Sequence, residues 1–190
     1  YSRSQAELLC DSVKERYGLD VKAYIGMRYW HPFTEEALEQ IRQDNIEALV
    51  ILPLYPQFSI STSGSSLRLL QEEFASAQPL VDRNMVHTVV PSWYNRPGYV
   101  KVMATLLRRE LEAFTPEQIA EAKAATPNEK PLHVLFSAHG VPQSYIEAGD
   151  PYQRQIQDCV DKIGQEIVDD NVEVHLSYQS RVGPIEWLRP

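Results

Sequence analysis

The chain has 190 residues, of which 43% are hydrophobic and 23% charged, enough for a folded protein with a buried core. Asp and Glu outnumber Lys and Arg by 26 to 18, so the net charge is −8. We expect no nucleic-acid partner, because phosphate binding needs a basic surface. No apolar run approaches the roughly 20 residues of a membrane span, and no secretory signal is recognisable. We therefore expect a cytoplasmic protein and leave open its association with a membrane surface.

Helical and extended patterns alternate along the chain. Apolar spacing or a start signal predicts helices at residues 4–17, 34–42, 64–74, 98–114 and 152–169. Short apolar runs predict strands at residues 21–26, 48–54, 86–90, 132–136 and 172–178. The run at 48–54 is apolar almost throughout, which is typical of a strand buried on both faces. Strands separated by helices predict right-handed crossovers, a mostly parallel sheet and an α/β fold.

A few residues mark where helices begin and end. Gly18 is expected just after the first helix, and Thr34 is expected to cap the second. Asp150 followed by Pro151 reads as the cap and first residue of a later helix, which is a structural role. Residues 115–130 read as a weak surface helix and a linker.

Residues 90–97 hold two prolines and two aromatic residues between a predicted strand and a predicted helix. An ordinary loop and a domain boundary explain them about equally well from the residues alone. Elsewhere, Cys10 and Cys159 lie far apart on predicted helices, which favours reduced thiols. Because no C-x-x-C pair is present, we expect no iron–sulfur cluster and no tightly bound cofactor in this stretch.

The most informative feature is the sequence SAHG at residues 137–140, which follows an apolar run. In a parallel sheet the carboxyl ends of the strands open onto the ligand crevice, and a glycine there allows the backbone to turn sharply. An imidazole at that position suits proton transfer near neutral pH and can also bind a divalent metal. His139 is therefore the leading candidate for catalysis, although a histidine at a strand end is often structural.

Several segments resemble, in order and spacing, the signature segments of ferrochelatases. They are LPLYPQFSISTSGSS (52–66), FSAHGVP (136–142), GDPY (149–152), YQSRVGPIEWL (178–188) and, as a further one, GMRYWHP (26–32). The resemblance covers the whole chain, and several motifs in the right order are far more specific than one short match. It implies insertion of Fe²⁺ into protoporphyrin IX, a lyase reaction that ends heme biosynthesis, with porphyrin and ferrous iron as substrates.

The same resemblance implies a fold of two Rossmann-like halves with the porphyrin cleft between them. It favours a domain boundary in the proline-rich segment, with residues 1–94 in the first half and 95–190 in the second. Ferrochelatases are roughly twice this long, so we expect an internal part of such a protein with both halves incomplete. In the family the matching histidine faces a Glu located beyond the last motif. We therefore expect the chain alone to be inactive.

The candidate substrate contacts follow from both arguments. A porphyrin is a flat apolar disc with two carboxylates, so its site needs aromatic walls and a few cationic or hydroxyl groups. Arg28 follows a predicted strand, where its guanidinium suits a carboxylate. The full set of predicted substrate contacts is Arg28, Tyr29, Tyr55, Ser59, Ser61 and Trp187. His139 is assigned to catalysis and to metal binding, and its use as proton acceptor or iron ligand stays open.

The remaining histidines are weaker candidates. His87, His133 and His175 lie inside predicted strands, where core or surface roles are favoured over metal binding, and His31 reads as a loop residue. Two other functions stay open: a tetrapyrrole-binding module without chemistry, and a chelatase for coproporphyrin or for cobalt. A serine hydrolase is disfavoured because the chain has no G-x-S-x-G sequence. The oligomeric state is not predicted.

Overall fold

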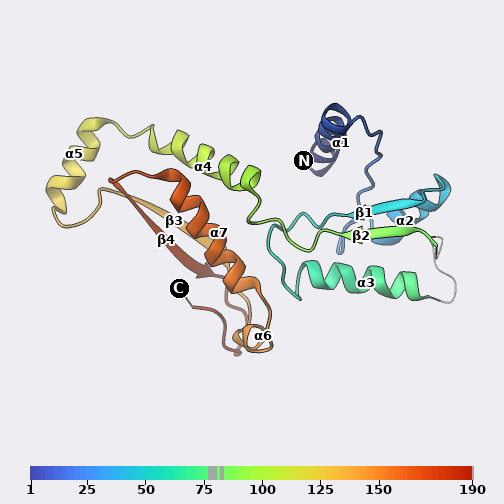
Figure 1. Ribbon diagram of the computed structural model, residues 1–190. Coiled ribbons are helices and arrows are strands. Elements are labelled where there is room, and N and C mark those ends of the chain that lie inside the picture. The colour runs from blue at the N-terminus through green and yellow to red at the C-terminus, as the bar shows by residue number, and fades with distance from the viewer. Residues whose placement is uncertain (77–80, 82–83, 190) are drawn as a thin grey trace. The chain divides into compact units, whose positions relative to one another are not determined.

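The computed structural model describes residues 1–76, 81 and 84–189, in which helices and parallel strands alternate (Figure 1). The helices are α1 Ser2–Tyr17, α2 Thr34–Gln43, α3 Ser63–Ala75, α4 Pro97–Leu111, α5 Pro116–Ala125, α6 Gln143–Glu147 and α7 Tyr152–Ile167. The strands are β1 Ala48–Ile51, β2 Val86–Val89, β3 Leu132–His139 and β4 Val172–Gln179. They form two parallel pairs, β1 with β2 and β3 with β4, which confirms the predicted α/β class. Within the described ranges, no helix is both long and apolar enough to cross a membrane.

The chain divides into two compact units. The first consists of residues 1–52 and 61–90, and the second of residues 53–60 and 91–190. Segment 53–60 thus belongs to the second unit although it interrupts the first in sequence, which no sequence signal indicates. The division expected from the family, at residues 94 and 95, stays a prediction.

The first unit has its core between its two-strand sheet and two helices (Figure 1). Leu38 and Ile41 on the apolar face of α2 are almost fully buried, together with Met85 just before β2. Leu70 and Phe74 of α3 pack against this cluster. The apolar spacing of the two helices therefore predicts their packing correctly, whereas α1 buries none of its residues.

Two strand predictions in this unit are wrong. Residues 21–26 form no strand, and nearby pairing is limited to a single bridge between Met27 and Phe33. Strand β1 ends at Ile51 rather than at residue 54 and is not buried on both faces, since Val50 is 65% exposed. A strand needs a neighbour for its backbone groups and a layer on each face for full burial. In the described residues, β1 has one neighbouring strand and residues 21–26 have none.

Of the two end signals predicted in the first unit, one is confirmed and one is off by one residue. Gly18 has φ of 66° and its N–H donates to the carbonyl of Lys14, so it ends α1 as expected. The cap of α2 is Phe33 rather than Thr34, which is a correction. The carboxylate of Glu36 accepts the Phe33 N–H at 2.6 Å and satisfies the start of this helix from inside its first turn.

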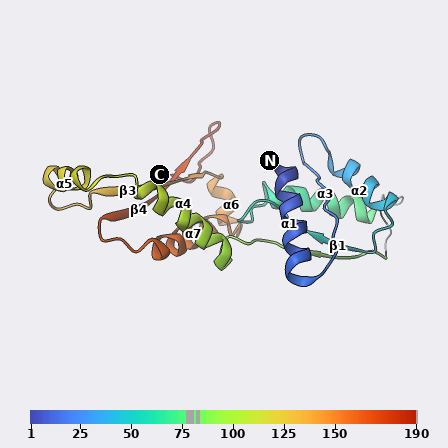
Figure 2. The ribbon, with the colours of Figure 1, turned by 90° about the horizontal axis from the view of Figure 1, so that it is seen from above.

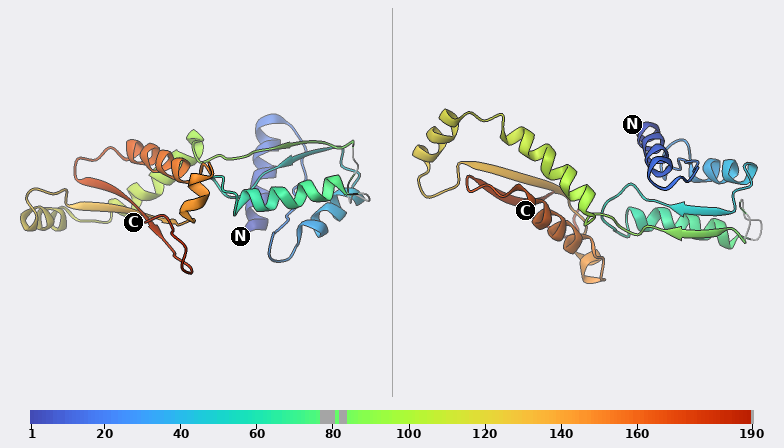
Figure 3. Two further views of the ribbon diagram at one scale, coloured as in Figure 1. Left: turned by 90° about the horizontal axis from the view of Figure 1, so that it is seen from below. Right: turned by 45° about the horizontal axis from the view of Figure 1, so that its top comes forward.

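The second unit is built on two long strands in register from Leu132 opposite Val172 to His139 opposite Gln179. Figure 3 shows β3 and β4 side by side in two further views. Even-numbered strand residues point toward α4 and α7, where Leu132 and Val172 join Ile163 in the core. The odd-numbered residues form the opposite face, on which Leu135 is 63% exposed.

Two short helices lie at opposite ends of the second unit. Helix α5, capped by Thr115 as the predicted surface helix, lies at one end, and α6 lies at the other (Figure 2). Helix α6 was not predicted, since five residues are too few for a periodic signal. Strand β3 extends beyond the predicted residue 136 to include His139. Helices α4 and α7 end earlier than predicted, at Leu111 and Ile167.

Candidate functional site

His139 is the last residue of β3, at the carboxyl end of the second unit's sheet. The hydroxyl of Tyr152 donates to the backbone carbonyl of His139 at 2.9 Å and fixes this strand end. Burial, and after it the charge of Asp150, raises the pKa of Tyr152, so the hydroxyl keeps its proton at neutral pH. The His139 side chain itself is exposed, and no described residue bonds to its imidazole. A fixed backbone with an open imidazole is what a proton acceptor or metal ligand needs.

Gly140 explains why this turn follows the histidine. Its N–H donates to the carbonyl of Gln179 at 2.6 Å. A Cβ at this position would lie 3.0 Å from the carbonyl oxygen of Ser180 and 3.1 Å from that of Gln179. A residue with a side chain at this position would therefore require the backbone at the end of β4 to shift by a few tenths of an ångström.

The segment that carries Trp187 returns alongside the loop after His139. Pro142 and Trp187 form an antiparallel bridge, and the N–H of Leu188 donates to the carbonyl of Val141 at 3.0 Å. The indole N–H of Trp187 donates to the carbonyl of Val182 at 2.9 Å, which leaves the ring half-buried. Two of the motifs quoted above thus meet at the carboxyl end of the sheet.

Ser59 is fully buried, and its hydroxyl donates to the carboxylate of Asp150 at 2.8 Å. The same carboxylate accepts the N–H of Ile60 at 2.9 Å and that of Tyr152 at 3.0 Å. Asp150 therefore ties segment 53–60 to the start of α7, where Pro151 rather than Asp150 is the cap. Substrate contact by Ser59 stays a prediction, and it requires this segment to move away from Asp150.

Tyr55 lies in the same segment and is 49% exposed, so its ring is accessible to a ligand. The segment is held at further points: the N–H of Phe58 donates to Gln155 at 2.7 Å, and the indole N–H of Trp93 donates to the carbonyl of Pro53 at 2.9 Å. Tyr55 thus stands on a loop whose backbone is fixed at both ends.

The first unit holds the other predicted contacts. The Nε–H of Arg28 donates to the hydroxyl of Ser65 at 3.3 Å, and the Tyr29 hydroxyl lies 3.5 Å from the same oxygen. The guanidinium lies over the Tyr29 ring, 5.1 Å from its centre. Ser65 is in the first turn of α3, where the helix dipole favours an anion. Arg28 and Tyr29 are therefore close to the start of α3 and do not follow a strand, which corrects the prediction. Ser61 is exposed and lies two residues before α3 in the sequence.

His31 has a structural partner. Its Nδ1 lies 2.8 Å from the carboxylate of Glu36, and its ring contacts Phe33 edge-on. The backbone N–H of Phe33, and secondly His31, hold the pKa of Glu36 below its usual value. This agrees with the loop role expected for His31.

Two residues that hold these segments in place were not predicted as parts of a site: Tyr152 and Asp150. Their partners His139 and Ser59 are 13 and 91 residues away in sequence. The short motifs place Asp150 and Tyr152 in the chain, but the contacts depend on the tertiary fold.

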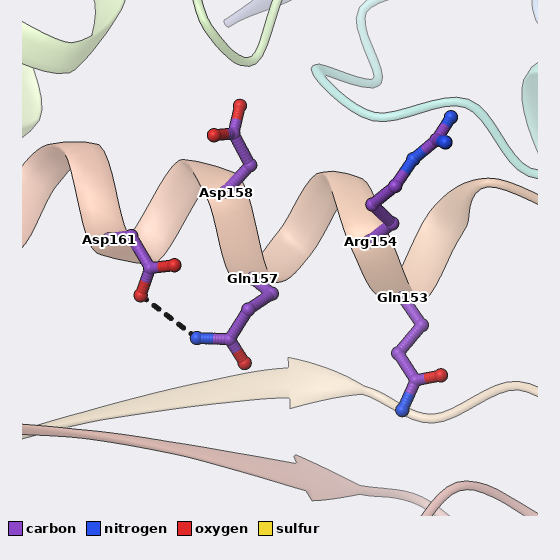
Figure 4. Close-up of a pocket in the computed structure, with 5 residues that line it drawn as sticks. All are labelled: Gln153, Arg154, Gln157, Asp158 and Asp161. Atoms are coloured by element: carbon purple, nitrogen blue, oxygen red, sulfur yellow. Dashed lines mark hydrogen bonds between the residues drawn. The ribbon is translucent and has the colours of Figure 1, made fainter.

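A separate surface hollow lies along α7 and is lined by Gln153, Arg154, Gln157, Asp158 and Asp161 (Figure 4). Two of its side chains bond to each other, since Gln157 donates to Asp161 at 2.9 Å. Asp158 accepts from Lys162 at 2.7 Å. With no apolar wall among these residues, the hollow does not suit a flat apolar ring.

Comparison with known proteins decides the family. The family model for Ferrochelatase matches residues 1–190. The chain belongs to the ferrochelatase family. It is 53% identical over 190 residues to ferrochelatase-2, chloroplastic, of Oryza sativa subsp. indica. The matched region is 98% of this chain and 33% of that protein. It is 54% identical over 177 residues to the ferrochelatase of Nostoc punctiforme, covering 91% of this chain and 41% of that protein.

A third relative covers the chain completely. The ferrochelatase of Picosynechococcus is 48% identical over 191 residues, which are 100% of this chain and 45% of that protein. The chain thus spans between a third and just under half of the length of these relatives. The segments quoted from the sequence all lie inside the matched region.

Proposed function

We propose that this chain is part of an enzyme that inserts Fe²⁺ into protoporphyrin IX to form protoheme in heme biosynthesis. The observation that carries the proposal is the exposed imidazole of His139 at the carboxyl end of β3, with Trp187 in the segment that pairs with the following loop. Membership of the ferrochelatase family supports the reaction.

The chemistry sets what the site must supply. Metal insertion removes two protons from pyrrole nitrogens while Fe²⁺ loses its bound water, so a base must stand near the ring nitrogens. An imidazole accepts a proton near neutral pH and also binds ferrous iron. In this proposal His139 accepts protons from the macrocycle or binds the entering iron. The hydrogen bond from Tyr152 and the close contact at Gly140 keep the histidine backbone in place for either task.

The other residues would bind the porphyrin. Arg28 and Tyr29 stand beside the start of α3 and offer a cation and a hydroxyl to a propionate. Ser61 is an exposed hydroxyl in the same unit. Tyr55 and Trp187 offer aromatic faces to the ring. Ser59 would act mainly through the position of the segment that carries Tyr55, because its own side chain is buried.

We also infer that ferrous iron is a substrate and that residues 1–190 hold no tightly bound cofactor. Cys159 is buried, which raises the pKa of its thiol, and Cys10 lies on α1. The proposal places the protein in the cytoplasm or at a membrane surface, whereas the rice relative named above is chloroplastic. We also propose that the two halves of the fold meet in sequence between residues 94 and 95.

The test is replacement of His139 by Ala in the active protein, with iron insertion and porphyrin binding measured separately. We expect iron insertion to fall by at least about a hundred-fold, because general base catalysis contributes about 10² to 10⁴. Porphyrin affinity, followed by fluorescence, should stay within a few-fold, since the imidazole acts on the reacting nitrogens and not on ring affinity.

His87→Ala is the matched control, because His87 lies in β2 of the first unit and contacts the carbonyl of Met85. It should leave iron insertion unchanged. If the His139 variant keeps more than about a tenth of kcat, the assignment of this residue is wrong. Porphyrin binding without any metal insertion by a longer protein that contains this chain would instead identify a tetrapyrrole-binding module.

A further inference from the structure

Three side chains that can bind a metal lie together on the exposed face of the second unit's sheet. His133 comes from β3, and Glu173 and His175 come from β4. The parallel register places Glu173 opposite His133 and His175 opposite Leu135. Because side chains two positions apart share a face, all three lie on the odd-numbered face, away from α4 and α7.

Their ligand atoms are close to one another. The Nδ1 of His133 lies 2.9 Å from the Nε2 of His175, with ring centres 5.1 Å apart and ring planes 28° apart. One ligand atom from each of the three residues lies within 4.8 Å of the others. Two nitrogens bound to one tetrahedral zinc at about 2.0 to 2.1 Å are about 3.3 to 3.4 Å apart. The two rings therefore need to separate by only a few tenths of an ångström, and the carboxylate oxygen, now within 4.8 Å of both nitrogens, needs to approach them by about 1.5 Å or less.

The bonding between the rings also fits. Two neutral imidazoles form this hydrogen bond only when one nitrogen carries a proton and the other offers its lone pair. A divalent ion between them accepts a lone pair from each ring once the donor ring has changed to its other neutral tautomer, in which the proton stands on the ring nitrogen away from the ion. The carboxylate of Glu173 then supplies negative charge, and the exposure of His133 and Glu173 leaves further positions open to water.

We propose that His133, Glu173 and His175 form a binding site for a divalent transition metal, separate from His139. Two imidazoles and one carboxylate suit Zn²⁺, Fe²⁺ or Co²⁺, whereas Ca²⁺ and Mg²⁺ prefer oxygen ligands alone. His139 is six residues further along β3, about 20 Å away at about 3.3 Å per residue, so the two sites cannot share one ion. The proposal rests on this geometry and does not depend on the proposed chelatase function.

The experiment is a Co²⁺ titration of the purified protein, followed by visible absorption and by equilibrium dialysis. We expect His133→Gln and His175→Gln each to weaken Co²⁺ binding by more than about 10- to 100-fold, which is the cost of losing only a supporting contact of a metal ligand. Glu173→Gln should also weaken binding while keeping the two imidazoles. His87→Gln is the matched control, because His87 lies in β2 of the first unit and outside both proposed metal-binding positions, and it should leave this binding unchanged.

A second measurement needs no variant. Diethylpyrocarbonate modifies accessible imidazoles, and Zn²⁺ bound at this site should protect His133 and His175 in peptides analysed by mass spectrometry. Far-UV circular dichroism checks that each variant is folded. The proposal is overturned if Co²⁺ affinity is equal in the unmodified protein and the variants, if only His139→Ala removes it, or if Zn²⁺ gives no protection.

Discussion

Arg28 combines three features of a carboxylate anchor. Its guanidinium is exposed, lies over the Tyr29 ring and donates to Ser65 at the start of α3. We expect Arg28→Leu mainly to raise the KM for porphyrin. A lost charge-assisted hydrogen bond costs about 1.5 to 3 kcal/mol, or about ten- to a hundred-fold. Steady-state kinetics of iron insertion measure this effect.

The control for Arg28 is a change in the substrate. A porphyrin whose propionates are esterified cannot form the ion pair, so the unmodified protein and Arg28→Leu should use the ester about equally well. If the variant loses as much with the ester as with the free acid, Arg28 does not bind the carboxylates.

Ser59 is expected to stabilise the fold. Its buried hydroxyl is one of three donors to the carboxylate of Asp150. We expect Ser59→Ala to lower the free energy of unfolding by about 1 to 3 kcal/mol, because the carboxylate loses a donor that water cannot readily replace. Urea denaturation measures the loss, and the exposed Ser144→Ala should change stability by less than about 0.5 kcal/mol. Equal stability of the two variants would refute the anchoring role.

At the scale of elements, the start of α2 depends on the charge of Glu36. Bonding to the Phe33 N–H holds the pKa of this carboxyl below its usual value of 4.5. A carboxyl with a lowered folded-state pKa stabilises the fold above its unfolded pKa, and the contribution is lost as pH falls through the folded value. The stability difference between the unmodified protein and Glu36→Gln should therefore shrink as pH falls below about 4.5.

Urea denaturation at several pH values between 7 and 3 measures that difference. The effects of titrating groups that do not contact Glu36 cancel, because both proteins share them. A difference that stays constant or grows in acid would show that Glu36 does not stabilise α2 through its charge.

Element predictions succeeded where the signal is local. Gly18 ends α1, because the left-handed conformation of that one residue decides it, and residues 115–130 contain the predicted surface helix α5. They failed where a distant partner decides: within the described residues no strand pairs with residues 21–26, and Val50 is 65% exposed. At the site, the motif around His139 predicted its place at a strand end. The contact of Ser59 with Asp150 was not predictable, since 91 residues separate them.

At the scale of the whole molecule, the candidate residues divide between the two units. The first holds Arg28, Tyr29 and Ser61, and the second holds Tyr55, Ser59, His139 and Trp187. Segment 53–60 counts with the second unit because Asp150 and Gln155 bind it there.

The last prediction concerns the 190-residue chain studied alone. In the described residues both sheets have two strands, and Leu135 and Val86 are 63% and 72% exposed. Unpaired strand edges and exposed apolar side chains favour self-association, so we expect light scattering to show species larger than a monomer. Iron insertion requires the ring and the metal to be held in reacting geometry. The chain matches at most 45% of the relatives cited above, so we expect weak or no insertion and porphyrin binding no tighter than about micromolar. Turnover by the purified chain near that of a longer relative would show that residues 1–190 suffice for the reaction.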